Sequence, residues 1–118
     1  MYPNMQTRIL MVNGKEVLTD SEGYIVYLDH WTEDFIEAQA KAEGLELTDE
    51  HREVVAFLRH YYQTHGVQCE VRKMVKHFKQ VWGKERGSSR YLHRIFPRGG
   101  PQKQGNRLAG LLRTKGEH

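Results

Sequence analysis

The single cysteine of the chain is its most reactive residue type. Cys69 lies just before a segment with helical periodicity, and the backbone amides at a helix start can lower the pKa of a nearby thiol. A reactive thiolate is one interpretation, and a small, partly buried residue without a redox role is the more common one. One cysteine cannot form an intramolecular disulfide, so we expect a reducing, cytoplasmic setting.

The other residue types that carry out chemistry show no productive spacing. Among seven histidines, His60 and His65 are five positions apart, which separates them on a helix, and no His-Glu-x-x-His motif occurs. The segment 83–87 is typical of a turn between helices and not of a phosphate-binding loop. The serines lie at turn or cap positions without a triad. We therefore expect no enzyme active site, no metal and no cofactor.

Length and composition indicate one domain. The chain has 118 residues, of which 38% are hydrophobic and 28% charged, as in an ordinary globular protein. No apolar run approaches the ~20 residues of a membrane span, and the N-terminus lacks the features of a signal peptide. We expect no contact with a membrane.

Charge is divided unevenly along this domain. Residues 1–50 hold three basic and eleven acidic side chains, whereas residues 51–118 hold fifteen basic and four acidic ones, for a net charge of +3. A basic half is typical of a surface for nucleic acid or for an acidic protein. Alternatively, the two halves pack together and neutralise each other. The sequence leaves both interpretations open.

The elements that position these residues are predicted to form an α+β fold. Asn13-Gly14 lies between two short apolar runs and favours a type I′ hairpin turn, and residues 24–28 are predicted as a third strand of a small antiparallel meander sheet. Helical periodicity begins at residue 32. The expected organisation is a β meander over 1–31, about five helices over 32–108, and a mobile C-terminal arm over 109–118. The helices are expected from Thr32 to about Gly44, from Thr48 to about Gly66, over 71–82, from Ser88 or Ser89 to Pro97, and from Pro101 through Leu108.

The helix over 71–82 separates an apolar face from a basic one. With the short helix 89–96 it could form a helix-turn-helix-like pair for DNA, although the connection is longer than the usual 3–4 residues. Such cations could equally bind an acidic protein or stay solvated. The candidate partner- or nucleic-acid-binding residues are Arg72, Lys73, Lys76, Lys79, Arg90, Arg94, Arg98, Lys103 and Arg107.

A series of short motifs runs along nearly the whole chain in one register. It includes Leu47-Thr48-Asp49-Glu50-His51, Val55-Ala56-Phe57-Leu58-Arg59-His60-Tyr61-Tyr62, Ser89-Arg90-Tyr91-Leu92 and Leu108-Ala109-Gly110-Leu111. Together with Val12-Asn13-Gly14-Lys15 and Asp29-His30-Trp31, this series resembles the DsrC/TusE family of small sulfur-carrier proteins. DsrC is also known as the gamma subunit of dissimilatory sulfite reductase. The fold implied by the resemblance, a small sheet packed on helices, agrees with the elements above.

The resemblance also implies where sulfur chemistry should reside. A typical arm in the family resembles KQACKIAGLPKPTGC plus one residue, with a carrier cysteine near the end and a second, upstream cysteine in members that work with sulfite reductase. In this register Asn106 takes the upstream position and Glu117 the carrier position. Two arm prolines are replaced by Leu112 and Thr114. Neither Asn nor Glu can form a persulfide, and whether Glu117 mimics an oxidised, anionic cysteine stays open.

The expected function follows from two features: the resemblance to the family covers nearly the whole chain, and both of the family's carrier cysteines are replaced. We expect a non-catalytic DsrC-like protein that binds sulfite reductase or sulfurtransferase-type partners and regulates sulfur metabolism. A DNA-binding regulator that uses the basic helices is the alternative. A sulfur carrier that uses an unfamiliar site ranks last.

Overall fold

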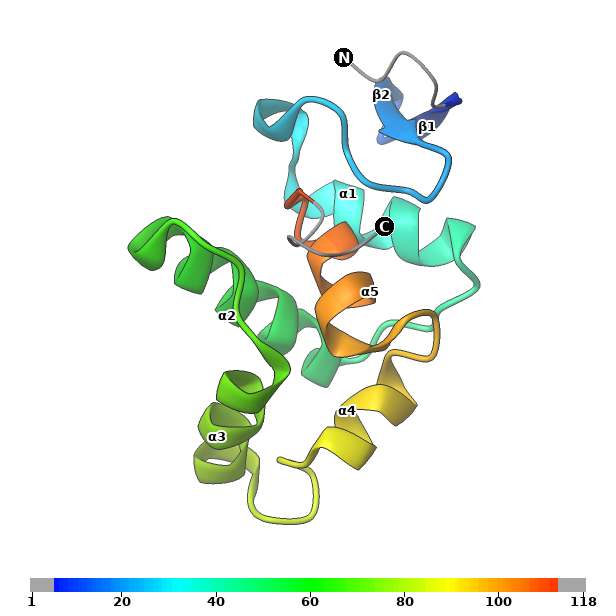
Figure 1. Ribbon diagram of the computed structural model, residues 1–118. Coiled ribbons are helices and arrows are strands. Elements are labelled where there is room, and N and C mark those ends of the chain that lie inside the picture. Colours follow the sequence, from blue (N-terminus) through cyan, green and yellow to red (C-terminus); the bar gives the residue numbers. More distant parts are fainter. Residues whose placement is uncertain (1–5, 113–118) are drawn as a thin grey trace.

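The computed structural model describes residues 6–112, and the α+β class predicted from the sequence is confirmed. The elements are β1 (Thr7–Val12), β2 (Lys15–Asp20), a 3₁₀ helix η1 (Leu28–His30), α1 (Glu33–Ala42), α2 (Asp49–His65), α3 (Val71–Trp82), α4 (Ser89–Ile95) and α5 (Gly100–Leu108). In Figure 1 the hairpin lies at one end beside α1, and α5 lies among α1, α2 and α4. No helix among residues 6–112 is long and apolar enough to cross a membrane.

The predicted hairpin at Asn13-Gly14 is confirmed. Both residues have positive φ, 50° and 81°, as a type I′ turn requires, and Val12 pairs with Lys15 across it. The alternation of side chains along β1 leaves Ile9 and Met11 exposed and directs Val12 inward. Val12 packs with Val17, Ile25 and Phe35 in a small cluster that joins the hairpin to α1.

The predicted third strand over residues 24–28 is wrong. This segment makes one isolated bridge, between Thr19 and Ile25, and the sheet has two strands. The Asp20 carboxylate accepts the backbone N–H groups of Glu22 and Tyr24 at 2.9 and 3.0 Å, which bends the chain after β2. The chain then enters η1 instead of continuing along β2. A short apolar run can pack without pairing as a strand, and periodicity does not distinguish the two cases.

The predicted helix boundaries agree with the structure. At the start of α2, Thr48 and His51 cap each other: the Thr48 N–H donates to Nδ1 of His51, and the His51 N–H donates to Oγ1 of Thr48. The other ring nitrogen of His51 donates to the Ile95 carbonyl at 2.6 Å, which ties α2 to the end of α4. The Ser88 hydroxyl caps α4, while Thr32 occupies the N-cap of α1 without a side-chain hydrogen bond.

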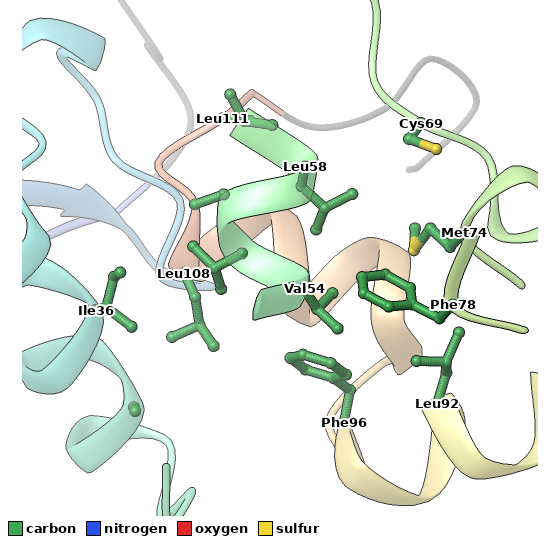
Figure 2. Packing of buried hydrophobic residues seen from close by; sticks show 13 residues of the cluster. Ile36, Val54, Leu58, Cys69, Met74, Phe78, Leu92, Phe96, Leu108 and Leu111 are labelled. Carbon is green, nitrogen blue, oxygen red and sulfur yellow. The ribbon is translucent and has the colours of Figure 1, made fainter. Parts of the chain in front are cut away.

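The main core gathers around α2 and α5. Figure 2 shows Val54 and Leu58 of α2 in the middle of the cluster, between Leu108 and the side chains of α3 and α4. All three are fully buried. The core continues past the end of α5, because Ala109 and Leu111 are buried as well. The first residues of the predicted arm, 109–111, therefore belong to the packed body, whereas Leu112 is 39% exposed and residues 113–118 lie outside the described part of the chain.

Candidate functional site

The base of the C-terminal arm is held by side chains from three other segments. The indole N–H of Trp31 donates to the Leu108 carbonyl at 2.9 Å, and Nη1 of Arg59 donates to the Ala109 carbonyl at 2.6 Å. Further along the chain, the side-chain amide of Gln68 donates to the Leu112 carbonyl at 3.1 Å. These three donors satisfy carbonyl groups at and beyond the end of α5, which have no partner within the helix.

Trp31 and Arg59 also pack on each other at this place. The Arg59 guanidinium lies 3.6 Å from the centre of the Trp31 ring, a cation–π contact. A Cβ atom at Gly110 would lie 2.2 Å from the Trp31 ring, and Gly110 has a φ of 69°. Only glycine meets both conditions. The backbone directly after α5 is therefore held by Trp31 and Arg59 and requires the bare Cα atom of Gly110.

Cys69 lies in the core, not on an accessible surface. It has no exposed area, and its thiol donates to the Glu70 carbonyl at 3.4 Å. Burial raises the pKa of the thiol to about 11, and this effect outweighs the nearby charge of Lys73. At neutral pH Cys69 is a protonated thiol in an apolar setting. Its position before α3 matches the sequence, and its burial agrees with the interpretation as a residue without a redox role, not with activation at a helix start.

Asn106 is a buried amide on α5. It has no exposed area, and neither Oδ1 nor Nδ2 has a hydrogen-bond partner among residues 6–112. An unsatisfied buried polar group costs about 1–3 kcal/mol. The other position singled out in the arm, Glu117, lies outside the described residues.

A second polar cluster joins α1 to α5 through one buried carboxylate. Glu43 accepts hydrogen bonds from Gln39 at 2.7 Å, from Gln104 at 3.0 Å, and from Nε and Nη2 of Arg107 at 3.2 and 2.8 Å. Burial lowers the pKa of Arg107, but the hydrogen bond and charge of Glu43 outweigh it, so that its pKa lies above the ordinary value. Arg107, proposed from the sequence as a partner-binding residue, is thus 8% exposed and bound inside the protein.

The remaining cations proposed from the sequence are exposed on three segments. Those of α3 are Arg72, Lys73, Lys76 and Lys79, and those of α4 are Arg90 and Arg94. The six-residue connection between the two helices, 83–88, is longer than a helix-turn-helix turn, and α4 has seven residues. Arg98 and Lys103 lie elsewhere, on the approach to α5 and on α5 itself, where both line the same cavity as Arg107. The structure therefore divides the predicted basic set into two surfaces.

The acidic and basic halves of the sequence meet in the fold. Within the described residues the ion pairs are Arg52–Glu37, Arg86–Glu50 and Arg107–Glu43, and each joins an arginine after residue 50 to an acid from the first fifty residues. The Arg52–Glu37 pair is exposed and contributes little to stability, whereas Glu50 of the Arg86–Glu50 pair is 20% exposed. This supports mutual neutralisation as part of the explanation for the uneven charge.

Sequence reasoning missed the donors that hold the arm base and the Glu43 cluster. Arg59 and Gln68 lie 50 and 44 positions from the carbonyl groups that they bind, and Glu43 lies 64 positions from Arg107. The resemblance included Trp31 and Arg59 in its motifs, but it did not indicate what they contact.

Comparison with known proteins decides the family. The family model described as "DsrC like protein" matches residues 11–116, nearly the whole chain. The chain belongs to the DsrC family. Sulfurtransferase TusE of Salmonella choleraesuis is 46% identical over 103 residues, which cover 87% of this chain and 94% of the relative. The TusE homolog of Haemophilus influenzae is 44% identical over 103 residues, which likewise cover 87% of this chain and 94% of the relative.

Solved structures of the DsrC family show the same fold. DsrC of Allochromatium vinosum has a TM-score of 0.82 at 39% identity, and the match covers 94% of this chain and 98% of the DsrC chain. The oxidized gamma subunit of dissimilatory sulfite reductase from Archaeoglobus fulgidus has a TM-score of 0.84 at 34% identity, with 92% and 98% covered. The names of these relatives concern sulfur transfer and sulfite reduction, and none concerns nucleic acid.

This DsrC-family chain has one thiol, and the structure places it in the core. In residues 6–112 no three His, Cys, Asp or Glu side chains gather in a way that could hold a metal ion. Sulfur chemistry in this chain would therefore depend on Cys69, whose Sγ atom is enclosed.

The buried amide of Asn106 leads to a stability prediction within this DsrC-family body. Asn106→Cys replaces two unpaired polar atoms by a thiol of similar size, so we expect the free energy of unfolding to rise by about 1–3 kcal/mol. Urea unfolding in a Cys69→Ser background measures it without interference from disulfides.

Gln104→Cys is the matched control on the same helix. Gln104 is also fully buried, but its amide donates to Glu43 and accepts from the Arg98 N–H, so this variant should lose stability. A loss in both variants would mean that the Asn106 amide is satisfied in solution.

Proposed function

We propose that this chain is a non-catalytic DsrC-family protein that binds the partners of its thiol-bearing relatives and regulates sulfur metabolism in the cytoplasm. The observation that carries the proposal is a complete family scaffold whose one thiol, Cys69, is enclosed and protonated at neutral pH. Its partners would be a sulfite reductase or a sulfurtransferase complex, the classes named for its relatives. Such a protein could occupy the docking surface of a sulfur carrier without passing sulfur on.

The geometry of the arm base supports docking without sulfur transfer. Trp31, Arg59 and Gln68 bind the backbone carbonyl groups of residues 108, 109 and 112, and not their side chains. These contacts to residues 108–112 do not involve the side chains at positions 106 and 117, where the family resemblance implies cysteines. The described end of the chain is therefore held without those cysteines.

Persulfide loading tests whether the protein carries sulfur. After incubation with polysulfide and removal of excess donor, intact-mass measurement of the wild-type protein should show no added sulfur. A Glu117→Cys variant should gain one sulfur atom: its thiolate bonds to a sulfane sulfur of the polysulfide, and the shortened polysulfide anion leaves. Cys69→Ser is the control that assigns any label on the wild-type chain.

The outcomes separate the hypotheses. Sulfur on Cys69 that passes to an acceptor thiol would contradict the proposal. The regulatory part requires a second measurement, in which the wild-type chain competes with a thiol-bearing relative for binding to purified sulfite reductase or sulfurtransferase complex. Unchanged binding of the relative at a large excess of this chain against both partners would rule out competitive regulation.

A further inference from the structure

A cationic cavity lies away from the arm base, between the hairpin, α1 and α5. Its volume is about 550 Å³, and its lining includes Arg8 of β1, Arg98, and Lys103 and Arg107 of α5. Cavities of this size accommodate small organic ligands. The cavity lies where segments that are distant in the sequence meet, so no local sequence motif predicts it.

Among residues 6–112, the cations that line this cavity outnumber the acids. The lining acids of this part of the chain are Glu22 and Glu43, and Glu43 is already paired with Arg107 at 2.8 Å. Arg8, Arg98 and Lys103 form no ion pair with any of residues 6–112. These three cations leave an excess of positive charge along the described lining, which favours an anionic ligand.

The backbone of Arg98 is positioned by the buried cluster around Glu43. The Arg98 N–H donates to Oε1 of Gln104 at 3.1 Å, and the Arg98 carbonyl accepts from Nη2 of Arg107. Gln104 and Arg107 are in turn bound to Glu43. The backbone that carries Arg98 is thus fixed on both sides of its Cα atom. Such preorganisation lowers the entropic cost of binding.

Lys103 lies close to Gly99, the residue after Arg98, at the start of α5. An atom at the Cβ position of Gly99 would lie 3.1 Å from Cβ of Lys103 and 3.7 Å from Nη1 of Arg107, so these two side chains flank the bare Gly99 backbone. Ile9, Leu10 and Ala42 add apolar side chains to the lining. The cavity combines cations for an anionic group with apolar side chains for an organic one.

We propose that this cavity binds a small oxoanion, a phosphate or sulfate group that is either free or the head of a small ester. Arginine meets two oxygen atoms of such a group at once, and lysine adds a point charge. This inference does not depend on the regulatory role proposed above, because it uses none of the residues at the arm base.

Calorimetric titration of the full chain tests the site, with inorganic sulfate, inorganic phosphate and adenosine monophosphate as probes. We expect saturable binding with one site per chain, and at least about tenfold weaker affinity in the Arg98→Gln/Lys103→Gln double variant. Lys79→Gln/Arg94→Gln removes the same charge from α3 and α4 and should leave the affinity unchanged. Tighter binding of the nucleotide than of phosphate would assign the site to an ester, and equal binding to the free ion.

Two results would overturn the proposal. One is the absence of saturation with all three probes. The other is an equal loss of affinity in both double variants, which would show attraction to the overall charge without a site. Acetate provides a further comparison: if it binds as tightly as sulfate, the cavity does not distinguish carboxylates, as on an acidic protein partner, from oxoanions of phosphorus or sulfur, and this result also overturns the proposal.

Discussion

Replacing Glu43 with alanine is expected to lower the free energy of unfolding by about 3–5 kcal/mol, because the variant leaves the Arg107 guanidinium buried without a counter-charge. Arg107 and Glu43 are 8% exposed each, and the same carboxylate also binds Gln39 and Gln104. The loss corresponds to a melting temperature lower by roughly 10–20 °C for a domain of this size. Thermal and urea unfolding at neutral pH measure it.

Two controls separate the buried charge from a general effect of the substitution. Glu46→Ala removes an exposed carboxylate a few residues away and should change the free energy of unfolding by less than about 0.5 kcal/mol. Adding Arg107→Met to Glu43→Ala removes the stranded charge and should recover part of the loss. A single variant as stable as the wild-type protein would show that Glu43 does not hold α1 against α5.

Cys69 is expected to react with iodoacetamide at pH 7.5 at least about 100-fold more slowly than an unperturbed thiol. Burial raises its pKa from 9.0 to about 11, which lowers the thiolate fraction by that factor, and the enclosed Sγ atom restricts access further. The rate should increase with pH up to about 11 instead of levelling off near 9. Intact-mass measurement of the folded protein at several pH values follows the reaction.

The direction of this shift also connects Cys69 to stability. Because the folded state favours the neutral thiol, the contribution of the buried thiol is complete below pH 9 and is lost as the pH rises towards 11. In urea the same cysteine should react as an ordinary thiol, which is the internal control. Rapid alkylation of the folded protein at pH 7.5 would contradict an enclosed Cys69 and would reopen it as a sulfur-carrying residue.

Local chemistry explains why so much of the fold was predictable. Asn13-Gly14 takes positive φ values at low cost, and Thr48 and Ser88 satisfy amides at the starts of α2 and α4. These effects act within a few residues, so the sequence alone carries them. The third strand failed because the turn at Asp20 and the packing of Ile25 against α1 depend on segments that come together only in the fold.

The sequence by itself determined the family register, the uneven charge and the presence of a single thiol. Tertiary structure decided what those features mean. It enclosed Cys69, directed Arg107 to a buried carboxylate 64 positions away, and separated Arg98 and Lys103 from the cations of α3. The physical reason is that desolvation and charge pairing depend on distances in space, whereas a sequence pattern reports only distances along the chain.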